Sequence, residues 1–195
     1  MKNQPLQQRR RSIRLKGFDY SEPGAYFVTI VTHDRSCLFG EIVDDQMELN
    51  SAGEAVTRWW SQLTRKFTTV ETDAFIVIPN HCHGIIVITD LVGADLCVGP
   101  PNIRAGAHAG APLPKMMQWF KTMTTNEYMR GVKALGWQPF RGELWQRNYY
   151  EHIVRNDESL NRIREYIVNN PIRWDVDREN PAAITPEPEN AWRAQ

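Results

Sequence analysis

The chain has 195 residues, of which 42% are hydrophobic and 24% are charged. This composition predicts one ordinary globular domain with modest tails and excludes a disordered or fibrous protein. The 23 basic and 23 acidic residues cancel, so net charge alone does not indicate a nucleic-acid partner.

Nothing in the sequence indicates a membrane or an oxidising compartment. The apolar runs, such as residues 75–78 and 85–88, are far shorter than the about 20 residues of a membrane span. The polar, basic N-terminus has no apolar stretch of the kind found in signal peptides. Cys37, Cys82 and Cys97 are widely spaced and form no C-x-x-C pair, which predicts reduced thiols. We therefore expect a cytoplasmic protein with no membrane partner.

Basic residues are concentrated in two regions. Residues 1–16 contain no acidic residue, and residues 115–150 are also net basic. A local excess of this kind can follow a phosphate backbone, although a solvated arm and a solvated helix face produce the same pattern. The N-terminal region contains Lys2, Arg9, Arg10, Arg11, Arg14 and Lys16.

The first half of the chain predicts strands around one helix. After a basic arm over residues 1–22, the β-branched and aromatic run 25–32 predicts a buried strand. A shorter strand is expected around 37–43. Ser51 or Asn50 can cap a helix to about residue 67, with Glu54 in capping-box register. Two apolar runs, 72–78 and 82–89, then flank Pro79-Asn80-His81 and predict a β-hairpin.

The second half begins with a Gly, Ala and Pro-rich stretch, residues 91–114, which predicts a flexible insertion. A helix is expected from about 115 to 133 and a β segment within 144–154. Asn156 or Asp157 can cap a last helix that runs to about 170 and is stopped by Pro171. The domain thus spans residues 23–175, and residues 176–195 are expected to form an extended tail.

These elements predict an α+β fold. Their order is compatible with a single antiparallel sheet whose helices pack on one face. Long alternating βα units are absent, so a doubly wound parallel sheet fits the sequence poorly.

One candidate metal site is the histidine pair at the start of the second hairpin strand. A strand places every second side chain on the same face, so His81 and His83 point one way and Cys82 the other. Neutral imidazole is a common metal ligand. Two histidines at the end of a strand also occur by chance, and the pair alone does not decide between these interpretations.

The last predicted helix carries a second group of polar side chains. Tyr166 and Asn170 lie four residues apart, beside the apolar stripe of Leu160, Ile163 and Ile167. This spacing places the tyrosine at the edge of the core, near the sheet. A packing tyrosine with its hydroxyl in water, and an ordinary helix-end asparagine, would give the same pattern.

Three segments together resemble a known family. Residues 75–87, 144–156 and 166–171 are similar to the single-tyrosine transposases of the HUH endonuclease superfamily, particularly the REP-associated tyrosine transposases. The resemblance covers roughly residues 10 to 175. Three ordered segments make it far more specific than a His-x-His pair.

The resemblance implies a fold and a reaction. It implies a ferredoxin-like sheet in which His81 and His83 hold a divalent metal, Mg²⁺ or Mn²⁺, although two imidazoles suit zinc equally well. It also implies that Tyr166 is the nucleophile and Asn170 the third ligand, with the adjacent Asn169 as an alternative. The enzyme would cleave and rejoin single-stranded or hairpin DNA through a 5′-phosphotyrosine. The 91–114 insertion is not a shared element of that family.

Further residues are candidates for contact with DNA. Tyr149, Tyr150 and His152 are rivals to Tyr166, but an amide one helical turn after a tyrosine fits the expected ligand geometry better. The expected DNA partner is a palindromic repeat flanking the gene, bound by a monomer or a homodimer. A hairpin-binding protein with little or no cleavage activity is the alternative. The candidate DNA-binding residues are Arg9, Arg10, Arg11, Arg14, Arg141, Arg147, Trp145 and His152.

Overall fold

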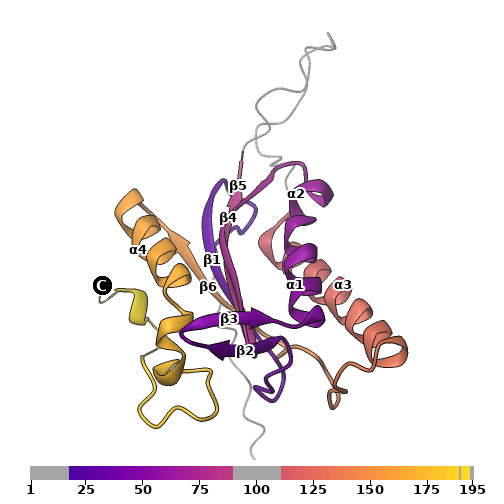
Figure 1. Cartoon of the computed structure of the whole chain (residues 1–195). Coiled ribbons are helices and arrows are strands. Elements are labelled where there is room, and N and C mark those ends of the chain that lie inside the picture. The colour runs from indigo at the N-terminus through magenta and orange to yellow at the C-terminus, as the bar shows by residue number, and fades with distance from the viewer. Residues whose placement is uncertain (1–17, 90–110, 189, 194–195) are drawn as a thin grey trace, which may run out of the picture.

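The computed structural model describes residues 18–89, 111–188 and 190–193 (Figure 1). Within these ranges the structure has strands and helices, with short 3-10 turns near the C-terminus. In chain order they are β1 (Gly24–Val31), β2 (Gly40–Val43), β3 (Gln46–Leu49), α1 (Ser51–Ser61), α2 (Leu63–Lys66), β4 (Val70–Ile78), β5 (His81–Ile88), α3 (Leu113–Ala134), β6 (Tyr150–Val154), α4 (Asp157–Val168), η1 (Pro171–Val176) and η2 (Ala191–Arg193).

The main sheet has four antiparallel strands in the order β4-β5-β1-β6. Its strands and covering helices follow one another as β1-α1-β4-β5-α3-β6, which is the ferredoxin-like arrangement. The predicted α+β fold with an antiparallel sheet is confirmed. The predicted hairpin is β4-β5, with Ile78 paired to His81 across the turn.

Helices cover both faces of the sheet, whereas the sequence led us to expect helices on one face. Helices α1 and α3 pack on one face in the larger core, and α4 packs on the other, as Figure 1 shows. In β1, Val28 contacts the first core and Phe27 the second. Strand β1 is apolar along nearly its whole length, without alternation, and such a strand is stable only when both of its faces are covered.

Two segments differ from their predicted strands. The predicted strand at 37–43 is β2, and it pairs with β3, which the sequence reading missed. Asp44 and Asp45 connect them at φ values of 48° and 61°, as in the tight turns favoured by hairpins. In the predicted 144–154 segment only β6 forms a strand, and Lys121 Nζ donates to the carbonyls of residues 146–148 before it.

The segment after α4 packs against the sheet instead of extending into solvent. Asp177 and Trp192 are each 3% exposed, and Trp192 packs beside Phe27 in the second core. The expected extended tail therefore differs from the structure, because a buried indole and a buried carboxylate anchor it. No helix in the described parts of the chain is long and apolar enough to cross a membrane.

Parts of two predicted segments lie outside the described residues. These are the basic residues of the N-terminal arm, including Arg9, Arg10, Arg11 and Arg14, and residues 91–110 of the predicted insertion. The last residues of that insertion, from Leu113, begin α3.

Candidate functional site

His81 and His83 lie at the start of β5, on the face covered by α4. On the neighbouring strand β1, Val31 pairs with His81 and Thr29 pairs with His83. The two side chains are 0% and 3% exposed, and their Nε2 atoms lie 3.0 Å apart. The predicted alternation of the strand therefore brings both imidazoles to one point inside the protein.

Hydrogen bonds on the far side of each ring fix the orientation of the histidines. His81 Nδ1 lies 2.8 Å from Asn80 Oδ1, and His83 Nδ1 lies 2.8 Å from Thr29 Oγ1. The Asn80 amide nitrogen donates to two backbone carbonyls, so Asn80 Oδ1 is the acceptor and His81 Nδ1 carries the proton. In the neutral ring, His81 Nε2 then presents its lone pair to the site.

Burial keeps both imidazoles neutral. Desolvation lowers the pKa of His81 to about 3. Desolvation also lowers the pKa of His83 well below its usual value, and the neighbouring His81 lowers it further, against the opposite effect of Asp177. At neutral pH both rings are therefore in the form that binds metal ions.

Helix α4 places an asparagine beside the histidines. Asn156 caps the helix by accepting a hydrogen bond from Ser159 N at 2.8 Å. At the other end, Asn170 is fully buried and its Nδ2 lies 3.3 Å from His83 Nε2. Asn169 is exposed. Of the two adjacent asparagines, the structure brings Asn170 to the histidine pair.

The Asn170 amide also leaves an oxygen suited to a metal ion. Asn170 Oδ1 is buried and has no hydrogen-bond partner among the described residues, which is unusual for an amide oxygen. In the structure the amide nitrogen faces the imidazoles, and it also donates to Asp177 Oδ2 at 3.3 Å. A half-turn of the amide exchanges Oδ1 and Nδ2, and a divalent cation among the imidazoles and the carboxylate would then replace that hydrogen bond and bind the oxygen.

The sequence reading missed a fourth polar group, Asp177. Its Oδ1 accepts a hydrogen bond from Glu179 N at 2.7 Å, and its Oδ2 lies 3.8 Å from His81 Nε2. His81, His83 and Asp177 offer ligand atoms that all lie within 4.8 Å of one another, and could hold a metal ion. Asp177 lies in the segment expected to be an extended tail, and no motif marks it.

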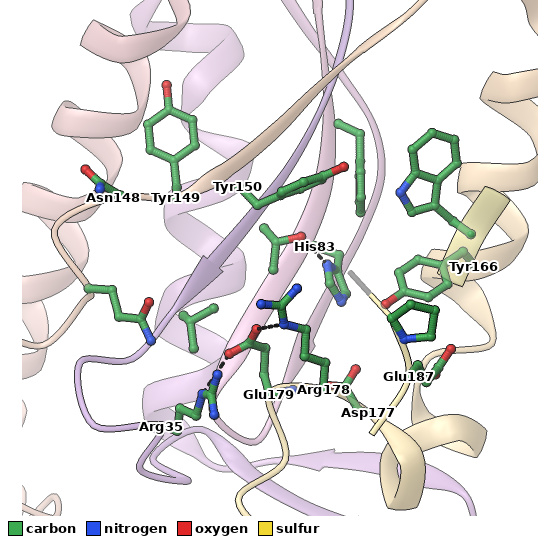
Figure 2. A pocket seen from close by; sticks show the side chains of 16 residues that line it. Arg35, His83, Asn148, Tyr149, Tyr150, Tyr166, Asp177, Arg178, Glu179 and Glu187 are labelled. Carbon is green, nitrogen blue, oxygen red and sulfur yellow. Dashed lines mark hydrogen bonds and ion pairs between the residues drawn. The ribbon is translucent and has the colours of Figure 1, made fainter. Parts of the chain in front are cut away.

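Tyr166 lies on the wall of a cavity of about 200 Å³ that reaches the site (Figure 2). Its ring packs edge-on against His83, with 5.3 Å between the ring centres, and against Phe27. Figure 2 shows its hydroxyl directed toward His83, whereas the hydroxyl of Tyr149 points away. The structure thus brings Tyr166, and not Tyr149, to the histidine pair.

The surroundings of Tyr166 keep its phenol protonated. Burial raises its pKa, the carboxylates of Asp177 and Glu187 raise it further, and the Arg173 guanidinium opposes them. The Arg173 guanidinium carbon lies 5.8 Å from the ring centre. A nucleophilic tyrosine here needs an additional positive charge or a proton acceptor.

Comparison with known proteins shows the family to which the chain belongs. The family model described as "Transposase IS200 like" matches residues 105–170. The chain is also 40% identical over 174 residues to an "Uncharacterized protein" of Haemophilus influenzae, across 87% of this chain and 92% of that protein. The chain belongs to the IS200-like transposase family.

Two further relatives confirm the resemblance to REP-associated transposases. This transposase is 26% identical over 158 residues to a "Putative REP-associated tyrosine transposase" of Haemophilus influenzae, covering 80% of this chain and 74% of that protein. Its fold matches the "Structure of the REP associates tyrosine transposase bound to a REP hairpin" with a TM-score of 0.52 and 19% identity, over 84% of this chain and 73% of that one. The match to the solved structure shows the shared fold.

The matched family region contains two of the five residues of the candidate site. It spans α3, β6 and α4, with Tyr166 and Asn170. The histidine pair precedes it, and Asp177 follows it. In this transposase the site is therefore assembled by the fold from three separate parts of the sequence.

The described candidate DNA-binding residues of the transposase fall into two groups. Arg141 and Arg147 are exposed, as a phosphate contact requires. Trp145 is 4% exposed and donates through Nε1 to Thr124, so it serves mainly as a core residue. His152 packs against Trp192, and burial lowers its pKa to about 4, so at neutral pH it carries no charge for a phosphate.

Asn80 should be a sensitive position of the transposase outside the proposed ligands. Asn80→Ala leaves the carbonyls of Arg35 and Glu179 and the His81 ring without a partner, which we expect to cost about 2–3 kcal/mol of unfolding free energy. Loss of a partner that orients a ligand typically weakens metal binding about 10- to 100-fold.

Urea unfolding and Mn²⁺ titration calorimetry measure the two effects. The exposed Asn148 provides a matched control, because Asn148→Ala removes an amide that makes no side-chain hydrogen bond to the described residues. Unchanged Mn²⁺ affinity in Asn80→Ala would show that the Asn80 contact does not orient His81 for metal binding.

Proposed function

We propose that this transposase cleaves and rejoins single-stranded or hairpin DNA, with Tyr166 as nucleophile and a divalent metal held by His81, His83 and Asn170. The observation that carries the proposal is the contact of the Tyr166 ring with His83, a buried, neutral imidazole whose Nε2 atom faces that of His81. When His83 Nδ1 carries the proton and donates to Thr29 Oγ1, both Nε2 atoms present lone pairs 3.0 Å apart, which can share a cation.

The donor atoms favour a metal that accepts both nitrogen and oxygen. Two imidazoles, the Asn170 amide oxygen and the Asp177 carboxylate would form such a set, and of the two expected ions it suits Mn²⁺ better than Mg²⁺. When bound, the ion would neutralise charge on the scissile phosphate and act as a Lewis acid. Its positive charge also offsets the carboxylates that raise the pKa of Tyr166.

The proposed reaction is a transesterification. Tyr166 Oη loses its proton and forms a bond to phosphorus, while the bond from phosphorus to the 3′-oxygen breaks and that oxygen takes up a proton. The products are a 5′-phosphotyrosine and a free 3′-hydroxyl. One phosphoester replaces another, so a second 3′-hydroxyl can reverse the step and rejoin the DNA.

Hairpin DNA is the proposed substrate because the chain shares its fold with a REP-associated tyrosine transposase described as bound to a REP hairpin. Palindromic repeats beside the gene are the proposed natural sites. The exposed Arg141 and Arg147, with the basic residues near the N-terminus, supply cations for such a polyanion.

Mapping the covalent adduct tests the proposal. The protein is incubated with Mn²⁺ and a hairpin from the flanking DNA that carries a single-stranded extension, and the adduct is digested with trypsin. The peptide of residues 165–173 contains Tyr166 as its one tyrosine, and that of residues 148–155 contains both rivals, Tyr149 and Tyr150. DNA attached to residues 165–173 supports the assignment, and attachment to residues 148–155 overturns it.

Hairpin binding without cleavage is the second candidate, and one observation favours it. The carboxylates of Asp177 and Glu187 lie close enough to Tyr166 to raise its pKa, which opposes attack by the phenolate. This candidate predicts no adduct under any metal condition, and hairpin binding unchanged when His81 and His83 become alanine.

A further inference from the structure

A second, larger cavity lies between α3 and the segment that joins it to β6. Its volume is about 620 Å³, and it opens to solvent as a groove. Its lining is divided into an apolar set and a polar set. The apolar set consists of Pro114, Met117, Leu144, Trp145 and Tyr149, and the polar side chains come mainly from α3.

The polar wall is a row along one face of α3. Gln118, Thr122, Thr125 and Asn126 recur at helical spacing and line the groove together. On the opposite side lies the exposed Arg147. Across the described ranges 18–89, 111–188 and 190–193, the side chains of Gln118, Asn126 and Arg147 make no hydrogen bond or ion pair. Their donors and acceptors are therefore free to bind a ligand.

The groove adjoins the cavity of Tyr166. Gln146 and Tyr149 line both cavities. Lys121 Nζ fixes this shared wall by donating to the carbonyls of Gln146 at 2.8 Å, Asn148 at 3.1 Å and Arg147 at 3.3 Å. It also lies 5.4 Å from the centre of the Tyr149 ring. The segment held by Lys121 thus borders both the groove and the cavity of the proposed nucleophile.

The charges of the two cavities differ. The groove is lined by Lys121 and Arg147 against a single carboxylate, Glu143. The Tyr166 cavity is lined by three carboxylates, Asp177, Glu179 and Glu187, against two arginines, Arg35 and Arg178, which both pair with Glu179. A polyanion that reaches Tyr166 is therefore held more favourably along the groove than across the carboxylates of the other cavity.

We propose that this groove binds the unpaired DNA strand adjoining the scissile phosphate, with Arg147 on a backbone phosphate and bases against the apolar set. The inference rests on the proposed function, because it takes DNA as the substrate. An unpaired strand is the occupant because its base faces are free to lie on apolar surface while its phosphates meet the polar rim. Paired bases in a stem do not expose those faces.

The experiment measures binding in a Tyr166→Phe background, where the proposed cleavage is blocked. Fluorescence anisotropy compares a hairpin without an extension and the same hairpin with an extension of about ten thymidines. Arg147→Ala should weaken binding of the extended hairpin about tenfold and leave the other unchanged. Because single-strand contacts release counterions, the slope of log K against log salt should also decrease by about 0.7.

Two further variants define the outcome. Asn126→Ala should weaken binding of the extended hairpin only. Because the lost contact is not ionic, the salt dependence of binding should not change. Arg130 is an exposed cation on α3 that does not line the groove, so Arg130→Ala should leave the preference for the extension intact. The groove assignment is overturned if Arg147→Ala and Asn126→Ala weaken binding of both hairpins equally. It is also overturned if these two variants weaken binding of neither hairpin.

The two proposals fail in distinguishable ways. If the adduct forms on Tyr166 but the groove variants do not discriminate between the hairpins, the groove inference alone is wrong. If the groove variants discriminate but no adduct forms under any metal condition, the groove stands as a DNA site and the proposed reaction is wrong.

Discussion

Tyr166→Phe is expected to abolish the covalent adduct and to lower DNA cleavage by at least about three orders of magnitude, because no other group replaces a missing nucleophile. The substitution should leave the fold intact. The Tyr166 hydroxyl makes no hydrogen bond to the described residues, and the phenylalanine ring retains the contacts with Phe27 and His83.

Single-turnover cleavage of a labelled extended hairpin in Mn²⁺ measures this effect. Tyr149→Phe and Tyr150→Phe are the matched variants, and each should still form the adduct. Tyr150 donates its hydroxyl to Asn190 Oδ1, and the Tyr149 hydroxyl points away from the histidines. If cleavage survives in Tyr166→Phe and disappears in one of these two variants, the nucleophile is Tyr149 or Tyr150 and not Tyr166.

His83→Ala should remove metal binding together with activity. Changing a residue that only orients a ligand costs about 10- to 100-fold in affinity, so deleting a ligand should cost at least about 100-fold. His83 is the imidazole that faces His81, Asn170 and the Tyr166 ring at once, and its loss removes the contact that these three side chains share.

The readout for His83→Ala is thermal stability with and without Mn²⁺, which does not depend on cleavage. At a Mn²⁺ concentration of about 100 times Kd, the native protein should gain about 2.7 kcal/mol, and the variant should gain almost nothing. His33→Ala is the control, because His33 is an exposed histidine outside the site. Equal Mn²⁺ stabilisation of the native protein and His83→Ala would show that the ion binds elsewhere.

Local patterns in the sequence accounted for much of the site. The period of two in β5 predicted that His81 and His83 would share a face, and a helix predicted to run to about residue 170 placed Tyr166 and Asn170 along one side, although α4 ends at Val168 and Asn170 begins the next turn. Both depend only on a single element and its regular geometry. The choice of Asn170 over Asn169 needed the structure, because the helix ends there and only packing decides which side chain is buried.

Other features depend on contacts between distant segments, which no local pattern encodes. Asp177 reaches the histidines because the chain after η1 packs back on the sheet, and that packing depends on the burial of Trp192 beside Phe27. The second layer formed by α4 was also missed, although the unbroken apolar run of β1 carried the signal for it. The groove on α3 needed the side chains of two elements together.

The hydrogen bonds of Asn80 have a consequence for biosynthesis. Asn80 donates to the carbonyl of Glu179, 99 residues later, and His83 meets Asn170, 87 residues later. During translation the histidine pair leaves the ribosome long before the segments that orient and complete it. A partly synthesised or truncated chain would thus carry the His-x-His sequence without a finished metal site. The proposed cleavage of DNA would become possible only once the segment that carries Asp177 has been made and docked.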